Sequence, residues 1–165
     1  MYTDVNTAVQ IAHHAAEFAW TWSVADLTTF GSAIGLHLNR LTRNSATFTT
    51  DHSNGRTDAD AYITTDGTPE LQRISYFTTD ITDPAHAACL VGVYTELSCR
   101  ITRDLGAPTR REAQPNSYLR WDLPNVILIL TAGDLSIDMD ILNPNYRTWL
   151  RNLDLDTFRP ETEVP

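Results

Sequence analysis

The chain contains no lysine. All 12 of its basic residues are arginine, against 21 acidic residues, and the formal net charge is −9. Binding of nucleic acid needs a basic surface to meet the phosphates, so this balance argues against nucleic acid as a partner. It favours a basic protein partner and helps to keep the chain in solution. The exclusive use of arginine indicates a GC-rich genome, such as that of an actinobacterium.

Long apolar runs are also missing, and none approaches the roughly 20 residues that a membrane-spanning helix needs. The first ten residues, MYTDVNTAVQ, lack the basic start and apolar stretch of a signal peptide. We therefore expect a cytoplasmic protein that does not bind membranes. With 165 residues, 42% of them hydrophobic, the chain is long enough for one domain with a sizeable core.

Sequence patterns that support catalysis or cofactor binding are absent. The chain has no glycine-rich phosphate loop and no HExxH, CxxC or GxSxG pattern. The nearest glycine turn contains Gly133, and a single glycine between two strands indicates a hairpin. We therefore expect a protein that is not an enzyme and has no catalytic residues, no cofactor and no metal.

Histidines and cysteines give no sign of a metal site or a disulfide. His13 and His14 are adjacent on a predicted helix, so they point about 100° apart and cannot chelate one metal together. Cys89 and Cys99 fall in one predicted helix, about 15 Å apart along its axis. This separation is too large for a disulfide, and we expect two small buried thiols.

The first third of the chain predicts two helices. Asp4 caps a helix over residues 5–20, whose apolar positions have the spacing of a buried stripe. Ser23 and Asp26 have the spacing of a capping box, and a second helix follows and ends near Gly35. Tryptophans 20 and 22 lie at the joint. We interpret them as large aromatics that fill the corner between two helices, in preference to a ligand platform.

Strand patterns and one clear helix follow. Residues 47–50, 61–65 and 71–78 predict strands, the last two joined by a hairpin at 66–69, and residues 51–60 predict a polar loop. Asp83 and Pro84 open a helix over residues 84–105, which Gly106 ends. Residues 110–116 predict a second polar loop.

The last third predicts three strands, over residues 118–123, 126–130 and 135–142, then a short helix over 145–153. The middle strand is apolar throughout, which is typical of a strand inside a sheet. The predicted order is ααβββαβββα. We therefore expect an α+β fold, with a mixed, largely antiparallel sheet and helices packed on one face. Residues 1–158 would form one domain, and residues 159–165 a loose C-terminal tail.

The strand over residues 135–142 alternates in character. Its apolar face carries Leu135, Ile137, Met139 and Ile141, and its polar face carries Asp138 and Asp140. Arg120 is expected on the Asp138 face, and Trp121 and Leu119 on the core side. Such aspartates are either solvated surface residues, an acidic patch that a partner binds, or a metal or catalytic pair. Our candidate partner-binding residues are Asp122, Asp134, Asp138, Asp140 and Arg120.

Several segments resemble a known group of proteins. They are WTWSVADLTTFGSAIGL at residues 20–36, RDLGAPTRR at 103–111, RWDLP at 120–124 and LSIDMDILNPNYRTWL at 135–150. Together they are similar to small actinobacterial proteins of a domain family of unknown function. Those proteins resemble the immunity proteins, or antitoxins, encoded beside polymorphic secreted toxins. This resemblance implies a protein-binding role and transfers no catalytic residue.

We therefore expect a non-catalytic protein-binding domain, foremost an immunity protein that covers the active site of a cognate toxin. The partner would be a toxin domain with a basic cleft, and both an NAD-consuming enzyme and a nuclease would fit. The alternative is a secretion chaperone or adaptor that holds an exported protein in an apolar groove near Trp20, Trp22 and Tyr146. A small metal-dependent enzyme that uses the aspartates is a third reading.

Overall fold

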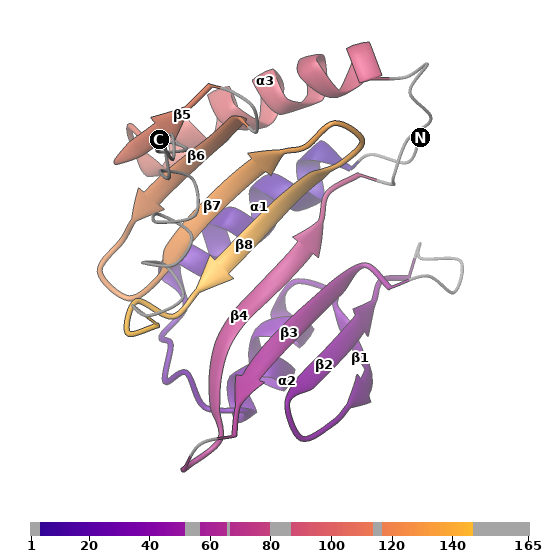
Figure 1. The fold of residues 1–165 in the computed structure, drawn as a ribbon, viewed down its shortest axis with the longest axis vertical. Coiled ribbons are helices and arrows are strands. Elements are labelled where there is room, and N and C mark those ends of the chain that lie inside the picture. The colour runs from indigo at the N-terminus through magenta and orange to yellow at the C-terminus, as the bar shows by residue number, and fades with distance from the viewer. Residues whose placement is uncertain (1–3, 52–56, 66, 80–86, 114–116, 147–165) are drawn as a thin grey trace, which may run out of the picture.

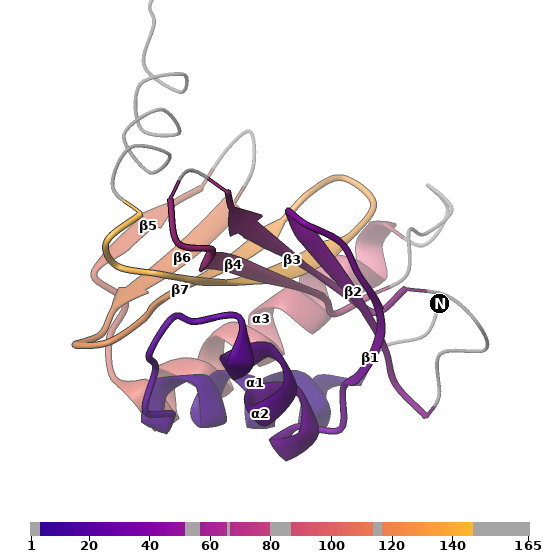
Figure 2. The ribbon, with the colours of Figure 1, turned by 90° about the horizontal axis from the view of Figure 1, so that it is seen from below.

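A single antiparallel sheet of eight strands carries three helices on one of its faces (Figures 1 and 2). The computed structural model describes residues 4–51, 57–65, 67–79, 87–113 and 117–146. The helices are α1 (Val5–Glu17), α2 (Ala25–Ala33) and α3 (Ala87–Leu105). The strands are β1 (His37–Leu41), β2 (Ser45–Thr49), β3 (Ala59–Thr64), β4 (Glu70–Phe77), β5 (Arg110–Glu112), β6 (Ser117–Asp122), β7 (Ile127–Ala132) and β8 (Ile137–Leu142).

The sheet consists of two four-stranded meanders that meet at β4 and β8. Its strand order is β1-β2-β3-β4-β8-β7-β6-β5, and every neighbouring pair is antiparallel. The predicted α+β fold is therefore confirmed, with helices on one face. The sheet is wholly antiparallel where we expected a mixed one, and each meander has four strands where we expected three.

The two additional strands are the edges of the sheet, β1 and β5. Every residue of both strands is exposed, so neither has the alternation of buried and exposed positions that marks an internal strand. The predicted polar loop over residues 110–116 in fact begins with β5, which pairs with β6.

The predicted cap of α1 is confirmed, because the Asp4 carboxylate accepts a 2.9 Å hydrogen bond from the Thr7 amide. The helix ends at Glu17, three residues before the predicted end. The chain becomes extended at Phe18, and the Trp20 indole donates a 2.8 Å hydrogen bond to the Ala15 carbonyl. This bond satisfies a carbonyl that the end of the helix leaves without an intrahelical partner.

Aromatic side chains fill the corner between α1 and α2, as predicted. The rings of Trp20 and Trp22 stack with centroids 4.4 Å apart, and Phe30 lies 4.7 Å from Trp20. The predicted capping box is wrong in one respect, because the N-cap residue is Val24 and makes no side-chain bond. The buried Asp26 carboxylate instead accepts hydrogen bonds from the Thr21 and Trp22 amides, at 2.8 and 2.7 Å. These bonds hold Trp22 at a positive φ of 58°, a conformation that is costly for a bulky residue.

Helix α3 ends before Gly106, which has a φ of 88° and supplies the predicted stop. Its predicted start at residue 84 lies outside the described residues. Both cysteines lie in this helix and form no disulfide, but both are exposed, so the prediction of buried thiols is wrong. The inward stripe of α3 consists of Leu90, Leu97 and Ile101, and the cysteines fall outside it.

The core lies between the helices and the sheet. Trp121 faces it, as predicted, and donates a 3.0 Å hydrogen bond to the Gly106 carbonyl. Of the predicted apolar face of β8, Ile137, Met139 and Ile141 are buried, whereas Leu135 lies in the preceding turn and is 36% exposed. Strand β7 is an interior strand, as its apolar sequence predicts.

The end of the chain is described only as far as Tyr146. The predicted helix over residues 145–153 lies almost entirely outside the described residues, and the predicted tail over 159–165 lies wholly outside them. Within the described part of the chain, no helix combines the length and the apolar character needed to span a membrane.

Candidate acidic binding face

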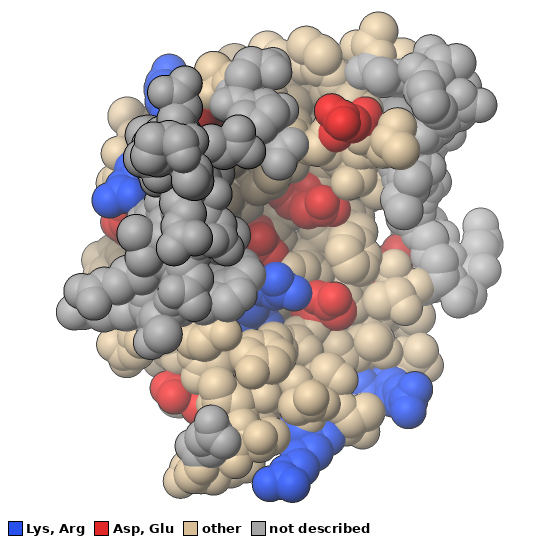
Figure 3. Space-filling model, in the orientation of Figure 1, with Lys and Arg blue, Asp and Glu red and all other residues tan. Residues whose placement is uncertain are grey.

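The side of the sheet on which none of the described helices lies, here called the open face, displays the acidic residues of the central strands (Figure 3). Successive strand residues alternate between the two faces, so residues opposite each other in neighbouring strands share a face. On the open face, Asp60 of β3 lies opposite Ser75 of β4, and Ser75 lies opposite Asp140 of β8. Asp138 lies two residues before Asp140 and shares its face. Asp60, Asp138 and Asp140 are called the acidic cluster below.

One arginine lies within this cluster. Arg73 of β4 places Nη2 3.7 Å from Oδ1 of Asp60 and Nε 4.0 Å from Oδ1 of Asp140. Neither of these two contacts is within hydrogen-bond distance. Among the described residues, the cluster therefore holds three carboxyl groups against one arginine, so Arg73 alone cannot balance three ionised carboxylates.

The carboxylates differ in their hydrogen bonds. Asp140, whose side chain is 21% exposed, accepts a hydrogen bond from the Ser75 hydroxyl. Asp138 accepts one from the Ser136 hydroxyl at 3.2 Å. Oδ1 of Asp60 is buried and has no hydrogen-bond partner among the described residues. A buried oxygen without a donor is costly, so Asp60 is the carboxylate least compensated by its own chain.

Burial raises the pKa of all three carboxyl groups above their ordinary values. For Asp60, the positive charge of Arg73 opposes this rise in pKa only in part. For Asp138, burial and the charge of Asp60 outweigh the hydrogen bond from Ser136, so its pKa is raised. For Asp140, burial and the charges of Asp138 and Asp60 outweigh Ser75 and Arg73, so its pKa is also raised. An additional cation at this place would favour the ionised form of each group.

Aromatic and aliphatic side chains adjoin the acidic cluster. Tyr62 of β3 is 40% exposed, and its ring lies 6.2 Å from the ring of Tyr146, in the segment after β8. On the other side of β8, Ile127 and Ile129 of β7 form a small apolar cluster with Leu142. Tyr62 therefore adds exposed aromatic area beside the charges of the open face, whereas Ile127 and Leu142 are buried.

The structure brings some of the predicted site residues together. Asp138 and Asp140 share the polar face of β8, as predicted, although both are partly buried and not fully solvated. Arg120 is also on the open face, but its side chain contacts Asp122 at 2.7 Å and not the acidic cluster. Ile129 of the intervening strand lies between Arg120 and Asp140.

Asp122 and Asp134 do not join the acidic cluster. Asp122 lies opposite Ile127 at one end of β7, whereas Asp134 is exposed in the turn at the other end. Burial alone would raise the pKa of Asp122, but hydrogen bonds from Thr109 and Arg120 and the charges of Arg120 and Arg110 outweigh it and lower that pKa. Asp122 is thus compensated within its own chain, unlike the acidic cluster.

Sequence reasoning missed Asp60, Ser75 and Arg73. Asp60 was assigned to the end of a polar loop, although residues 59–63 alternate between buried and exposed positions. This alternation, with small or apolar residues at 59, 61 and 63, could have extended the predicted strand to include Asp60. The approach of β4 to β8 has no signal in the sequence, because the paired residues are 61 to 69 positions apart.

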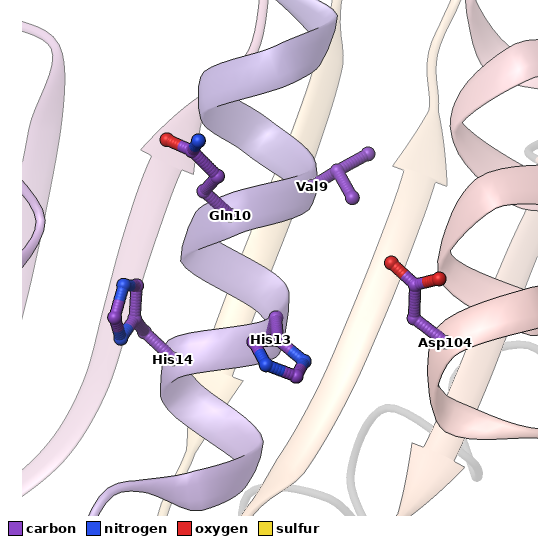
Figure 4. A pocket seen from close by; sticks show the side chains of 5 residues that line it. All are labelled: Val9, Gln10, His13, His14 and Asp104. Carbon is purple, nitrogen blue, oxygen red and sulfur yellow. The ribbon is translucent and has the colours of Figure 1, made fainter.

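A hollow lies on the helix side of the sheet, between α1 and α3 (Figure 4). Val9 and His13 point toward Asp104 of α3, while Gln10 and His14 project from the other side of α1. The two histidines therefore diverge, as predicted, and His13 contacts Glu17 at 3.4 Å. Among the described residues, no group of three or more His, Cys, Asp or Glu side chains is arranged to hold a metal ion. The acidic cluster is therefore not such a group either.

The tryptophans expected near an apolar groove lie elsewhere. Trp22 is only 6% exposed, and Trp20 packs against Phe18 and Phe30. Trp22 belongs to the buried core, and Trp20 is partly buried and packs against it.

These features define a class: an α+β domain in which one face of an eight-stranded sheet is covered by helices and the other carries a partly buried acidic cluster. The family described as "Family of unknown function (DUF6301)" matches residues 6–143, and the chain belongs to it. The match ends directly after β8 and includes every residue of the acidic cluster. The chain has no match among curated proteins or among solved structures.

Proposed function

We propose that this chain is a non-catalytic protein-binding domain that binds its partner through the open face. The observation that carries the proposal is the gathering of three partly buried carboxylates around one arginine of the described residues, on the face that the described helices leave uncovered. Ionised carboxylates that are partly removed from water, with raised pKa values, gain from a cation that approaches them. A basic protein surface supplies such cations in a fixed arrangement and associates faster because of the charge attraction.

More specifically, we propose an immunity protein that covers the active site of a cognate secreted toxin. Clefts that bind NAD or nucleic acid are lined by basic side chains because their substrates carry phosphates. The acidic cluster is complementary to such a cleft, and a sheet wide enough to cover it would exclude the substrate sterically. The quoted segments resemble a domain family of unknown function whose members resemble immunity proteins, and this resemblance supports the same proposal.

The direct test is protection of cells. The toxin domain encoded beside this chain should be lethal alone, and co-expression of this chain should restore growth and abolish the toxin's activity in a purified mixture. A variant with Asp138→Asn and Asp140→Asn should protect less well. If the neighbouring protein is harmless, or if this chain does not protect against it, the immunity proposal is wrong.

The secretion-chaperone alternative makes a different prediction. It requires a contiguous apolar surface, because exported substrates are held through their apolar segments. The exposed large hydrophobic residues in the described part of the chain are Leu38, Leu41, Tyr62, Val91 and Leu135, which lie on β1, β3, α3 and the turn before β8. A chaperone would keep an exported protein soluble and would bind it equally well after the acidic cluster is neutralised, whereas an immunity protein would not.

A further inference from the structure

The corner formed by α2, β1 and β2 differs in charge from the chain as a whole. Residues 27–50 contain no aspartate and no glutamate, although the chain has 21 acidic residues against 12 arginines. Within this stretch, Arg40 of β1 and Arg43 of the turn between β1 and β2 are exposed. Figure 3 shows basic side chains along the lower margin of the open face, where these two strands lie. This corner is therefore locally basic in a chain of net negative charge.

The two arginines are not neutralised by their own surroundings. Neither side chain forms an ion pair or a hydrogen bond within the described part of the chain. Thr47 lies opposite Arg40, and β2 contains no charged residue. The remaining basic group of β1 is His37, which already contacts Asp51 at 2.9 Å. Arg40 and Arg43 are thus available to carboxylates of another molecule.

Strand β1 is also an open edge of the sheet. It pairs with β2 on one side, and the described residues supply no backbone hydrogen bond to its other side. Leu38 and Leu41 lie on the helix side of this edge and are 40% and 51% exposed, whereas Arg40 lies on the open face. By contrast, the other edge strand, β5, has three residues, and all of them are charged, which is one way in which proteins protect an edge from pairing.

A β-bulge at Asn39 decides which side chains meet at the β1 edge. Leu38 and Arg40, on either side of Asn39, lie opposite consecutive residues of β2, so Asn39 is an extra residue in β1. The extra residue puts Leu38 and Leu41 on the same side of the sheet, although they are three positions apart. A bulge and a cation also deter unmatched strands, and a second copy of β1 would bring arginine close to arginine. The edge therefore fits a strand with carboxylates.

We infer that β1 docks an extended segment of a partner protein in which acidic and apolar side chains alternate. Added beside β1, such a segment supplies the backbone hydrogen bonds that the edge lacks, as in strand addition to other exposed sheet edges. Its carboxylates meet Arg40 on the open face, and its apolar side chains meet Leu38 and Leu41 on the helix side. At physiological ionic strength, charges more than about 8 Å apart are largely screened, so the local arginines outweigh the net charge.

Three synthetic peptides of seven residues test this edge on the full chain. The matched peptide is Thr-Glu-Val-Glu-Val-Glu-Thr, whose glutamates share one side of the extended peptide and whose valines share the other. The reversed peptide has arginine in place of each glutamate. The third peptide is the matched one with N-methyl groups on its five central residues, which removes backbone donors and keeps every side chain. Binding is measured by changes in the backbone amide NMR signals at physiological ionic strength.

The matched peptide should bind about threefold to tenfold more tightly than either of the others, the range that exposed charge pairs and cross-strand contacts produce. The signals that change should belong to β1 and β2. Arg40→Glu should abolish the preference for the matched over the reversed peptide, and Leu38→Ser/Leu41→Ser should weaken binding of the matched peptide. The control Arg103→Glu makes the same charge change on α3, where the side chain is 72% exposed, and should leave the preference unchanged.

Equal affinities of the matched and reversed peptides would overturn the inference, and so would equal affinities of the matched and N-methylated peptides. A dimer that the unmodified chain forms through β1 would assign the edge to a second copy and would also overturn it. The spectra report whether each variant is folded, and the comparison of peptides on the unmodified chain needs no variant.

The inference does not rest on the proposed function, because it uses a different surface. The variant Asp138→Asn/Asp140→Asn should therefore bind the matched peptide as the unmodified chain does. A loss of peptide preference and a loss of protection against a toxin are thus separate outcomes.

Discussion

The two faces of strand β8 carry opposite chemistry, although their residues alternate one by one along the chain. Ile137, Met139 and Ile141 face the helices and are at most 1% exposed. Asp138 and Asp140 face the other way and are partly buried, although none of the described helices lies on that face. Burial stabilises the fold on the first face, because apolar area leaves water, and it costs free energy on the second, because charge leaves water. The first face thus stabilises the fold, and the second face is the one that we propose for binding.

The covered face should be the more sensitive to truncation. Replacing Ile141 by alanine removes buried methyl groups and leaves a cavity, so the free energy of unfolding should fall by about 2–5 kcal/mol. Urea denaturation measures this change, and Asp140→Asn, one residue earlier on the open face, is the matched comparison. A cost below about 1 kcal/mol for Ile141→Ala would show that the covered face is not the tightly packed core described here.

A buried carboxylate with full hydrogen bonding should behave differently from the acidic cluster. Asp26 accepts hydrogen bonds from the amides of Thr21 and Trp22, so Asp26→Ala should destabilise the chain by about 1–3 kcal/mol. Asp26→Asn keeps an acceptor oxygen and should cost less. Thermal unfolding of both variants tests this order, and equal stability of Asp26→Ala and the unmodified chain would contradict it.

The acidic cluster should make the free energy of unfolding depend on pH. Unfolded aspartates titrate near pH 4, and burial raises the pKa values of Asp60, Asp138 and Asp140 in the folded chain. Above these raised values the folded chain holds partly buried negative charge. As the pH falls through them, the folded chain takes up protons before the unfolded chain does, and the contribution of these groups to stability rises until about pH 4.

The double variant Asp138→Asn/Asp140→Asn should therefore be more stable than the unmodified chain at neutral pH, and this advantage should shrink as the pH approaches about 4. Urea denaturation over a pH series measures the difference between the two chains. The lowered pKa of Asp122 makes its contribution to stability fall on acidification, but Asp122 is present in both chains, so this contribution largely cancels in the difference between them. An advantage that grows on acidification would contradict the raised pKa values.

The smallest effect is expected outside both faces of the sheet. Cys89 and Cys99 are exposed on α3, so replacing each by serine should change the free energy of unfolding by no more than about 0.5 kcal/mol. Both thiols should also react with a thiol reagent in the folded chain without prior denaturation. Protection of either thiol from the reagent would show that α3 packs differently.

Local features of the fold could be predicted because they are encoded within a few consecutive residues. The cap at Asp4, the stop at Gly106 and the hairpin between β3 and β4 each depend on short patterns with a direct physical cause. The same holds for the alternation in β8, which correctly placed Asp138 and Asp140 on one face. Edge strands β1 and β5 were missed because full exposure removes the alternation on which such predictions depend.

The acidic cluster could be predicted only in part, because it depends on which strands are neighbours. Asp138 and Asp140 are local to one strand, whereas Asp60 and Arg73 come from the other meander. Only the antiparallel pairing of β4 with β8 brings them together. Pairing between distant strands is set by the packing of the whole sheet, and one sequence gives no local signal for it.

The central proposal, that the open face binds the partner, is tested most directly by affinity for that partner, which the proposed function takes to be a toxin domain encoded beside this chain. The variant Asp138→Asn/Asp140→Asn removes two charges from the open face, and Glu96→Gln/Asp104→Asn removes two from α3 on the helix side. The Asp138→Asn/Asp140→Asn variant should weaken binding by about tenfold or more, because cations of the partner at the centre of the interface would lose the carboxylates that pair with them. The Glu96→Gln/Asp104→Asn variant should leave the affinity unchanged within about twofold, because exposed charges outside the interface contribute little to binding. Equal affinities of the two double variants would contradict the claim.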